Sequence, residues 1–421
     1  MLFRNILAAV LSTGVVAALP AEEPVSKRSV DFKWGSQKVR GLNLGGWLVL
    51  EPWITPSIFK NVDQSLGIVD EFTLTEKLGR DAAYNILKPH WDTWCTFADF
   101  QKIAKAGFNT VRLPFGYWAY SLDAGEPYTQ GAAPYVDAAI DWARETGLKV
   151  ILDLHGAPGS QNGFDNSGHK SPPRWQQGST TAQTLAVLKT ISDKYAQVQY
   201  QDVVVAVELL NEPLSGALNF DQIKQFYRDG FNQVRRISDT PVMLHDAFVS
   251  PSAWNGFLSV SDNNAQNVII DHHEYQVFTN DLVAMQPWQH RQHVCNNIGS
   301  YASGTDKWVV VGEWTGAMTD CAPALNGYGI GARYDGTYAG SPFVGSCADK
   351  NDIANWNQTF KDDMRGYIEA QLSAFESQTQ GWVFWNFKTE GAHEWDAFKL
   401  LDNGIFPQPL TDRKFGGICS S

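Results

Sequence analysis

Short apolar runs recur along the chain, and each is followed by a longer amphipathic segment. The runs are mostly continuous rather than alternating, as expected for strands buried on both faces of a parallel sheet. The intervening segments repeat apolar positions every three or four residues, which is typical of helices packed on one face. Eight such runs predict strands at residues 39–44, 110–114, 150–155, 203–209, 242–245, 268–271, 308–312 and 381–385.

Eight strands that alternate with helices predict an α/β fold, a (β/α)8 TIM barrel with extended loops after its strands. A doubly wound sheet is the structural alternative, but no Gly-x-Gly-x-x-Gly sequence follows the first strand. The clearest helical patterns lie at residues 97–104, 223–237 and 352–378. A Gly-rich stretch at residues 327–345 is predicted to form a long loop over the seventh strand.

The N-terminus has the features of a secretory signal. Arg4 precedes an apolar run and then small residues, which predicts a signal peptide over residues 1–21. Residues 22–28 then form a predicted pro-segment that ends in the dibasic pair Lys27-Arg28, so residues 29–421 are expected to form one mature domain. We therefore expect a secreted protein, extracellular or associated with the cell wall. The sequon at Asn357 is a candidate glycosylation site.

The five cysteines agree with an oxidising compartment. None belongs to a Cys-x-x-Cys motif, so a structural zinc site is not expected. Five cysteines are most simply two disulfides and one free thiol. Cys321 and Cys347 are close in sequence and flank the Gly-rich loop, so we pair them, and Cys295 then pairs with Cys419. Cys95 lies among aromatic residues and is predicted to be a buried thiol.

Charge and composition exclude some partners. The chain carries 33 Lys and Arg against 45 Asp and Glu, a net charge of −12, without a basic run. Neither nucleic acid nor an anionic membrane surface is therefore an expected partner. Aromatic residues make up 13% of the chain, with 16 Trp. Most are expected in the core, and a minority would suit a flat, uncharged ligand such as a sugar.

Polar and aromatic residues follow the ends of the predicted strands. In a (β/α)8 barrel these carboxyl ends meet at one rim, where active sites lie. Helix caps alone would not explain an arginine, several histidines, glutamates and a tryptophan there. The residues, in chain order, are Arg112, His155, Asn211, Glu212, His273, Tyr275, Glu313 and Trp385.

Two of these residues, Glu212 and Glu313, directly follow strongly apolar runs. Glycoside hydrolysis uses such a pair, one carboxyl as general acid and base and the other as nucleophile or as the base that activates water. The chain contains no Gly-x-Ser-x-Gly sequence, so a serine hydrolase is not predicted. The His272-His273-Glu274 sequence lacks the spacing of a metalloprotease helix, so neither a metal nor another cofactor is implied.

The motifs around these glutamates carry a family resemblance. Leu-Leu-Asn-Glu-Pro at residues 209–213 and Val-Gly-Glu-Trp at residues 311–314 resemble the acid/base and nucleophile motifs of glycoside hydrolase family five. Further motifs at residues 43–47, 112–114, 153–163, 276–278 and 385–390 resemble secreted fungal exo-β-1,3-glucanases. Together they span nearly the whole chain from about residue 32 to Cys419.

The resemblance implies a role for each catalytic residue. Glu212 would be the proton donor and later the base, with a raised pKa, and Glu313 would be the nucleophile. Arg112 would orient Glu313 and keep it ionised. Tyr275 would donate a hydrogen bond to Glu313. His155, Asn211 and His273 would complete the sugar subsite around the scissile bond.

The resemblance also implies residues that bind the substrate. Trp385 would form the platform under the sugar ring, and Glu51 would hold hydroxyls at the closed end of the pocket. Phe164 and Phe278 would clamp the next glucose. Further subsite candidates are Asp165, Asn166, Asn326 and Arg333.

The resulting expectation is a retaining exo-β-1,3-glucanase that releases glucose from the non-reducing ends of β-glucan and works as a monomer. Its two carboxyl groups should lie about 5–5.5 Å apart. Three alternatives stay open: a transglycosylase that uses the same residues, an enzyme for another linkage or an endo-enzyme such as a β-1,6-glucanase or mannanase, and a non-catalytic glucan-binding wall protein.

Overall fold

Eight parallel strands close into a barrel in which each strand pairs with the next and the last pairs with the first. The computed structural model describes residues 30–417 and 419. The predicted signal peptide at residues 1–21 and the pro-segment at residues 22–28 therefore lie outside the described residues. The predicted (β/α)8 fold is confirmed. The strands are β1 Val39–Asn43, β2 Thr110–Gly116, β3 Lys149–Gly156, β4 Val204–Glu208, β5 Val242–His245, β6 Val268–Glu274, β7 Trp308–Trp314 and β8 Gly381–Phe384.

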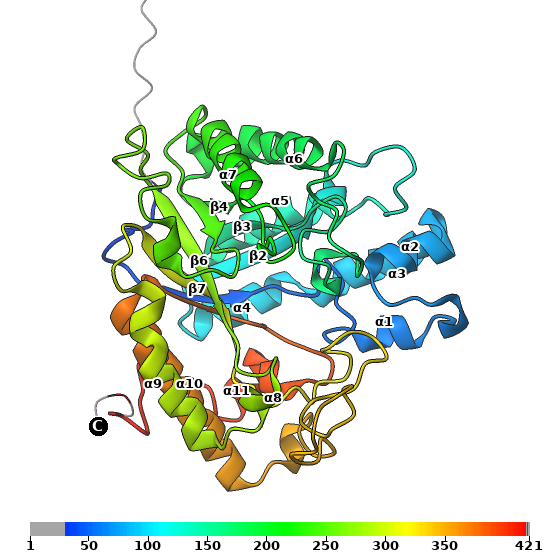
Figure 1. Cartoon of the computed structure of the whole chain (residues 1–421), viewed down its shortest axis with the longest axis vertical. Helices are drawn as coiled ribbons and strands as arrows, with labels where there is room; N and C mark the ends of the chain where they lie inside the picture. Colours follow the sequence, from blue (N-terminus) through cyan, green and yellow to red (C-terminus); the bar gives the residue numbers. More distant parts are fainter. Residues whose placement is uncertain (1–29, 418, 420–421) are drawn as a thin grey trace, which may run out of the picture.

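Helices surround the barrel. Figure 1 shows α6 and α7 along its upper side, and α9 and α10 next to each other along its lower side. The α-helices are α1 Pro56–Lys60, α2 Glu71–Leu78, α3 Arg80–Trp94, α4 Phe97–Lys105, α5 Ala133–Thr146, α6 Thr180–Tyr195, α7 Phe220–Arg235, α8 Asn280–Val283, α9 Pro287–Ala302, α10 Gln358–Gln378 and α11 Ala397–Asp402. Short 3₁₀ turns are η1 Gln64–Leu66, η2 Tyr117–Ala119, η3 Asp165–Ser167, η4 Val198–Tyr200, η5 Pro251–Trp254, η6 Ile353–Asn355 and η7 His393–Trp395.

Four strands, β2, β3, β6 and β7, extend further than the apolar runs predict, and two of them do so through the predicted site residues. Strand β6 continues through its two histidines to Glu274, and β7 continues through Glu313 to Trp314. The pairing of β6 with β7 resumes after a register shift between His272 and His273. Backbone pairing thus holds polar side chains at the strand ends, where polarity alone predicts a loop.

The helix predicted at residues 352–378 begins later than expected, at Gln358. The segment forms a 3₁₀ turn and then a separate helix, and a polar residue caps the start of each. The side chain of Asp352 accepts from the amide of Ala354 at the start of η6, and that of Asn357 accepts from the amide of Phe360 at the start of α10. The predicted glycosylation site at Asn357 therefore lies exposed at a helix start.

The lower part of the barrel interior is apolar. Ile151, Val205, Met243, Ile269 and Val310 belong to one buried cluster that fills it. Such packing leaves no room for polar groups at this level, as is usual for (β/α)8 barrels. Polar side chains in the barrel are therefore confined to the carboxyl ends of the strands.

Both predicted disulfides are present. Cys295 on α9 is bonded to Cys419, and Cys321 is bonded to Cys347 within the long loop after β7. Cys95 is unpaired and buried, as predicted. Among the described residues, no helix has both the length and the apolar character needed to cross a membrane.

The loop after β7 covers a buried acid, Glu394 of η7. Its Oε2 accepts a hydrogen bond from Thr319 Oγ1 at 2.8 Å, and its Oε1 has no hydrogen-bond partner among the described residues. Burial raises the pKa of Glu394 to about 7, against the lowering effect of Thr319. The folded protein therefore favours the protonated, neutral form of this carboxyl group.

This raised pKa predicts a pH-dependent stability. Between the ordinary glutamate pKa of 4.5 and about 7, the folded chain binds a proton at Glu394 that the unfolded chain has lost. The free energy of unfolding therefore falls as the pH rises through this window. Glu394→Gln should match the wild type at pH 4.5 and exceed its stability at pH 8 by on the order of 1–3 kcal/mol in urea unfolding.

The control is Glu145→Gln, which changes an exposed glutamate on α5. It should shift the stability little at either pH. If Glu394→Gln had the same effect at pH 4.5 and pH 8, the assigned pKa would be wrong.

Candidate active site

Arg112, on β2, is fully buried among four carboxylates at the carboxyl end of the barrel. Its guanidinium nitrogens lie 2.7 Å from Glu208, 2.9 Å from Glu313, 3.1 Å from Asp153 and 3.6 Å from Asp271. Burial alone would lower the pKa of Arg112, but the four carboxylates raise it well above its ordinary value. The guanidinium is therefore a permanent cation that holds the acids of several strands together.

The strand period explains why these acids share one side of the sheet with the predicted site residues. Asp153 is two residues before His155, and Asp271 is two residues before His273, so each pair points to the same face. Between β6 and β7 the approach is so close that a Cβ at Gly312 would overlap the Asp271 carboxylate. Glycine is therefore required next to Glu313.

Glu313 is held at both oxygens. Its Oε1 accepts from Arg112 Nη1 at 2.9 Å, and its Oε2 accepts from Tyr275 Oη at 2.8 Å. Burial and the charge of Glu212 raise the pKa of Glu313 above its ordinary value, although His273 and Arg112 act in the opposite direction. The two hydrogen bonds fix the orientation of the carboxylate.

Glu212 follows β4 in a left-handed backbone conformation, with φ of 46°, which is uncommon for a glutamate. Its Oε1 accepts from His273 Nδ1 at 2.8 Å, and its Oε2 accepts from Asn166 Nδ2 at 2.9 Å. Burial raises the pKa of Glu212, but the hydrogen bond and charge of His273 outweigh it and lower the pKa to about 2.

His273 lies between the two glutamates. Its Nδ1 is 2.8 Å from Glu212 and 3.4 Å from Glu313, while its Nε2 is 3.1 Å from Asp271. Burial lowers the pKa of His273, but the charges of Glu313 and Asp271 and its hydrogen bonds raise it well above the ordinary value. Because both ring nitrogens face carboxylates, the imidazole carries two protons.

One of the two expected pKa directions differs in the structure. We expected a raised pKa at Glu212 and an ionised Glu313 maintained by Arg112. The pKa of Glu212 is lowered instead, because the His273 cation donates directly to it. Burial raises the pKa of Glu313, and Arg112 lowers it in the expected direction.

His155 and Asn211 connect Arg112 to Trp385. Asn211 accepts from Arg112 Nη2 at 2.8 Å, and its Nδ2 lies 3.5 Å from His155 Nε2. His155 Nδ1 in turn donates to Asp153 at 2.6 Å. The His155 ring lies nearly parallel to the Trp385 ring, with centroids 5.5 Å apart. A chain of hydrogen bonds thus fixes the ring against which Trp385 packs.

A cavity of about 450 Å³ lies above these groups. Arg112, His155, Asn211 and His273 are not among its lining residues and form the layer beneath. The predicted site residues that line it are Glu51, Phe164, Asp165, Asn166, Glu212, Tyr275, Phe278, Glu313, Asn326, Arg333 and Trp385.

The cavity differs between its walls and its entrance. Glu51 is buried, accepts from Trp53 Nε1 at 2.9 Å, and has a pKa that burial raises well above its ordinary value. Phe164 and Phe278 are 47% and 41% exposed, as expected for rings at an entrance. The cavity therefore offers polar groups at depth and apolar rings at its mouth.

Asn326 and Arg333, both in the loop after β7, are tied to a buried acid. Asn326 Nδ2 donates to Asp320 at 2.9 Å, and Arg333 Nη1 lies 3.2 Å from the same carboxylate. Both residues line the cavity, but polar groups of each are already bonded to Asp320. They shape the wall of the cavity through Asp320.

Sequence reasoning missed the acids beneath the site: Asp153, Glu208 and Asp271. A signal was present, since each is a charged residue within an apolar strand, and two of them precede a predicted site histidine by two positions. Sequence reasoning also missed Trp53 and Trp395, which line the cavity with their ring centroids 5.0 Å apart. Neither tryptophan lies at a strand end, so its place in the sequence did not mark it as a site residue.

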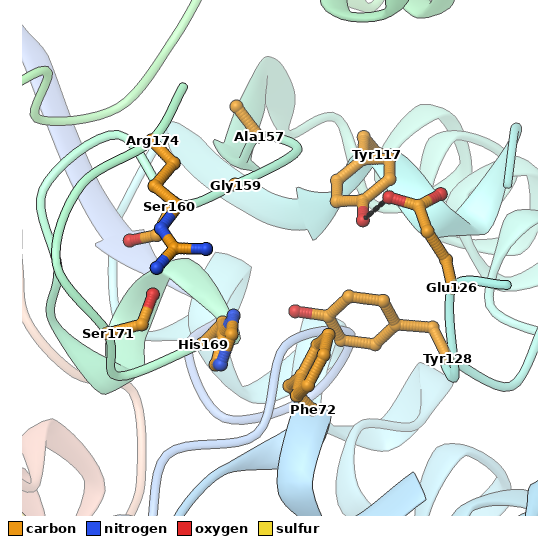
Figure 2. Close-up of a pocket in the computed structure, with 10 residues that line it drawn as sticks. All are labelled: Phe72, Tyr117, Glu126, Tyr128, Ala157, Gly159, Ser160, His169, Ser171 and Arg174. Carbon is orange, nitrogen blue, oxygen red and sulfur yellow. Dashed lines mark hydrogen bonds between the residues drawn. The ribbon is translucent and has the colours of Figure 1, made fainter. Parts of the chain in front are cut away.

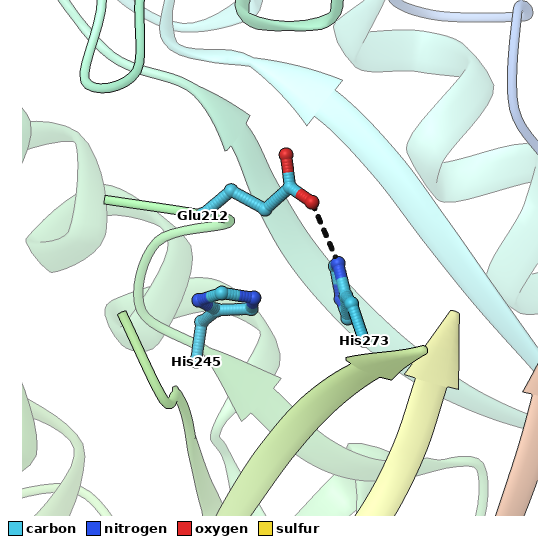
Figure 3. Close-up of side chains that lie close together, drawn as sticks. All are labelled: Glu212, His245 and His273. Carbon is cyan, nitrogen blue, oxygen red and sulfur yellow. Dashed lines mark hydrogen bonds and ion pairs between the residues drawn. The ribbon is translucent and has the colours of Figure 1, made fainter. Parts of the chain in front are cut away.

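Glu212, His245 and His273 are close enough to test as metal ligands, with ligand atoms within 4.8 Å of one another (Figure 3). His245 Nδ1 accepts from the amide of Ala247 at 3.0 Å, so the proton of the neutral ring is on Nε2. Both nitrogens of His273 already face carboxylates. The cluster therefore presents N–H donors and does not fit metal ligation in this arrangement.

Comparison with known proteins agrees with this chemistry. Residues 81–332 match the family described as Cellulase (glycosyl hydrolase family 5). The chain belongs to glycosyl hydrolase family 5. This family member is 49% identical over 418 residues to the glucan 1,3-beta-glucosidase of Blumeria graminis, covering 98% of this chain and 96% of that protein. It is therefore a glycoside hydrolase.

Other similar proteins extend the comparison. The glucan 1,3-beta-glucosidase of Schwanniomyces occidentalis is 45% identical over 421 residues, covering 98% of each chain. Among solved structures, the rutinosidase from Aspergillus niger has a TM-score of 0.71 at 21% identity, covering 89% of this family 5 chain and 99% of that chain. Endoglucanase Cel5A from Thermotoga maritima has a TM-score of 0.51 at 16% identity, covering 88% and 96%. These structures support the shared barrel fold alone.

Arg112→Lys should impair both stability and activity of this family 5 hydrolase. A lysine ammonium is a compact charge and cannot donate at once to Glu208, Asn211 and Glu313. Leaving buried groups unpaired typically costs about 3–5 kcal/mol. We expect a lower melting temperature and a lower kcat for glycoside hydrolysis.

The control is Arg144→Lys, at a partly exposed ion pair with Asp202, which should cost at most about 1 kcal/mol. Equal melting temperatures and rates for the two variants would contradict the assigned role of Arg112.

Proposed function

We propose that this protein is a secreted, exo-acting, retaining glucan 1,3-β-glucosidase that removes glucose from the non-reducing ends of β-1,3-glucan. The observation that carries the proposal is the pair Glu212 and Glu313, which meet at His273 on the floor of one cavity. The names and near-complete coverage of the fungal relatives support the substrate.

The spacing of the two carboxyl groups supports retention of anomeric configuration. One oxygen of Glu212 lies 2.8 Å and one oxygen of Glu313 lies 3.4 Å from the same nitrogen of His273. These two oxygens are therefore separated by no more than the sum of the two distances, which fits a closely set pair such as the carboxyl groups about 5–5.5 Å apart in retaining enzymes.

The shape of the cavity supports exo action. The buried pair Glu51 and Trp53 lines it from the loop after β1, and Asn326, Arg333 and Tyr338 line it from the disulfide-closed loop after β7. An endo-enzyme needs an open cleft through which the polymer runs. A cavity closed by such a wall can take only the end of a glucan chain.

The reaction follows from the positions of the side chains. Glu212 protonates the oxygen of the leaving sugar while the Glu313 carboxylate attacks the anomeric carbon, so the glycosidic bond breaks and a glycosyl ester forms. Water then attacks the anomeric carbon, Glu212 takes its proton, and the ester bond to Glu313 breaks. Arg112 and Tyr275 orient the nucleophile throughout.

We take the proton needed for the first step to rest on His273, because the pKa of His273 is raised and that of Glu212 is lowered. The Nδ1 to Oε1 distance of 2.8 Å allows its transfer to Glu212. The second nitrogen stays bonded to Asp271, which keeps the ring in place. We infer that His273 supplies the proton that Glu212 delivers.

Secretion is part of the proposal and rests on the N-terminal sequence. The apolar run and the dibasic pair fit removal of residues 1–28. The two disulfides are consistent with this, because such bonds persist in oxidising compartments.

Two substitutions separate the catalytic roles. Glu313→Gln should lower kcat by roughly 10⁴-fold or more on both laminarin and an aryl β-glucoside, because both need the nucleophile. Glu212→Gln should lower the rate of laminarin hydrolysis about 10²–10⁴-fold. It should lower much less the rate at which the glucosyl group is transferred from an aryl glucoside, because that leaving group needs no acid. Glucose release measures laminarin hydrolysis, and release of the aryl alcohol measures glucosyl transfer.

Glu274→Gln is the matched control, since Glu274 lies on β6 near His272 rather than at the paired glutamates. It should retain most of the activity. Wild-type rates from Glu313→Gln would rule out the assignment of the nucleophile.

A further inference from the structure

A second cavity, of about 290 Å³, shares no lining residue with the catalytic cavity. It lies between the start of α2, the segment after η2 and the loop from β3 to α6 (Figure 2). That loop also carries Phe164, Asp165 and Asn166, which line the catalytic cavity. The two cavities thus lie on different faces of one loop.

The walls of this second cavity are aromatic. The Phe72 and His169 rings stack with centroids 3.7 Å apart, and the Tyr128 ring stacks on Trp118 at 4.1 Å. Phe72 also meets Tyr128 edge to face at 5.4 Å. These ring contacts give the cavity an apolar border against which the C–H groups of a sugar can pack.

Its polar groups converge without partners. Tyr128 is only 2% exposed, yet its hydroxyl has no hydrogen bond within the described part of the chain. The ring nitrogens of the half-buried His169 and the guanidinium of the exposed Arg174 have no hydrogen bond or ion pair among residues 30–417, so both are free to bind a ligand. Figure 2 shows the Tyr128 hydroxyl and the Arg174 guanidinium pointing into the same space. The Tyr128 hydroxyl has no partner in the described part of the chain and faces the cavity, so a ligand group could bond to it.

The opposite wall supplies an acceptor. Glu126 is held in place by hydrogen bonds from Tyr117 Oη, from the amide of Asp123 and from Gln183 Nε2. Burial lowers the pKa of His169, so its ring is neutral and offers one donor and one acceptor. Donors and acceptors therefore alternate around the cavity, which matches the hydroxyls of a sugar.

The charges favour a neutral ligand. The cavity is lined by one cation, Arg174, and one carboxylate, Glu126. The nearby negative charge of Asp70 acts on both Tyr128 and His169 and disfavours an anion. A volume near the lower end of the usual range for ligand sites, about 300–1,000 Å³, suits one hexose.

The loop that presents Arg174 is rigid. The amide of Arg174 donates to the carbonyl of Gly159 at 2.7 Å, and a Cβ at Gly159, whose φ is 77°, would meet the Arg174 backbone. A Cβ at Gly168 would overlap Trp118 and approach the Tyr128 hydroxyl. Glycines at these two positions keep the cavity open, so binding requires little rearrangement.

We propose that this cavity is a second, non-catalytic binding site for a neutral hexose unit, and specifically for a glucosyl unit of β-1,3-glucan. The choice of glucose rests on the proposed function, whereas the choice of a neutral sugar rests on the cavity. A glucan held there stays beside the loop that borders the catalytic cavity. The site would retain the enzyme on a polymer between cleavage events.

The test is a calorimetric titration of the full-length Glu313→Gln protein with laminaritriose, a β-1,3-linked glucose trisaccharide. We expect two binding sites per chain. Adding Tyr128→Phe, which removes only the hydroxyl, should weaken the second site by about ten-fold. Adding Arg174→Ala should reduce the stoichiometry to one.

Two exposed residues give matched controls on the same background: Tyr84→Phe on α3 and Arg236→Ala after α7. Both should keep two sites. A single site in Glu313→Gln, or two sites of unchanged affinity after both Tyr128→Phe and Arg174→Ala, would overturn the proposal.

The outcome is separable from that of the proposed function. If the wild type failed to cleave laminarin but laminaritriose still bound at a site sensitive to Tyr128→Phe, the proposed function would fail and the second site would stand. If laminarin were cleaved and only one binding site were found, the proposed function would stand and the second site would fail.

Discussion

The charge of Arg112 is the constraint on which the rest of the site depends. Four carboxylates, Asp153, Glu208, Asp271 and Glu313, come from four strands and meet within 3.6 Å of one buried guanidinium. Without that cation, carboxylates at this depth would be protonated or would repel one another. The arginine therefore lets the barrel hold four acids close together beneath the catalytic cavity, and its planar fork sets the orientation of the acids that it contacts.

That negative charge decides where the proton is. Asp271 and the two paired glutamates surround His273, and together they hold its imidazole in the doubly protonated form. The result is a low pKa at Glu212 in the ligand-free protein, although general acid catalysis at this position needs a proton. In the proposed mechanism the protonated His273, within hydrogen-bond distance of Glu212, supplies the proton for the first step, and the attacking water returns it in the second.

Much of this architecture could be predicted from the sequence. Continuous apolar runs mark all eight strands, and the residues that end them, from Arg112 to Trp385, line one cavity or form the layer beneath it. What could not be predicted depends on distances between strands. The proximity of Asp271 to Gly312, the location of the proton and the second cavity at Tyr128 arise from packing between segments far apart in the chain. No local pattern encodes such distances.

The most direct test of the mechanism is to trap its covalent intermediate. An activated 2-deoxy-2-fluoro-β-glucoside slows both steps, but its good leaving group lets the first proceed, so a retaining enzyme accumulates the glycosyl ester. Mass spectrometry of the digested protein then locates the added mass. We predict that the label is on the peptide containing Glu313, and specifically on that residue. A label on Glu212, or turnover of the reagent without any labelled peptide, would contradict the mechanism.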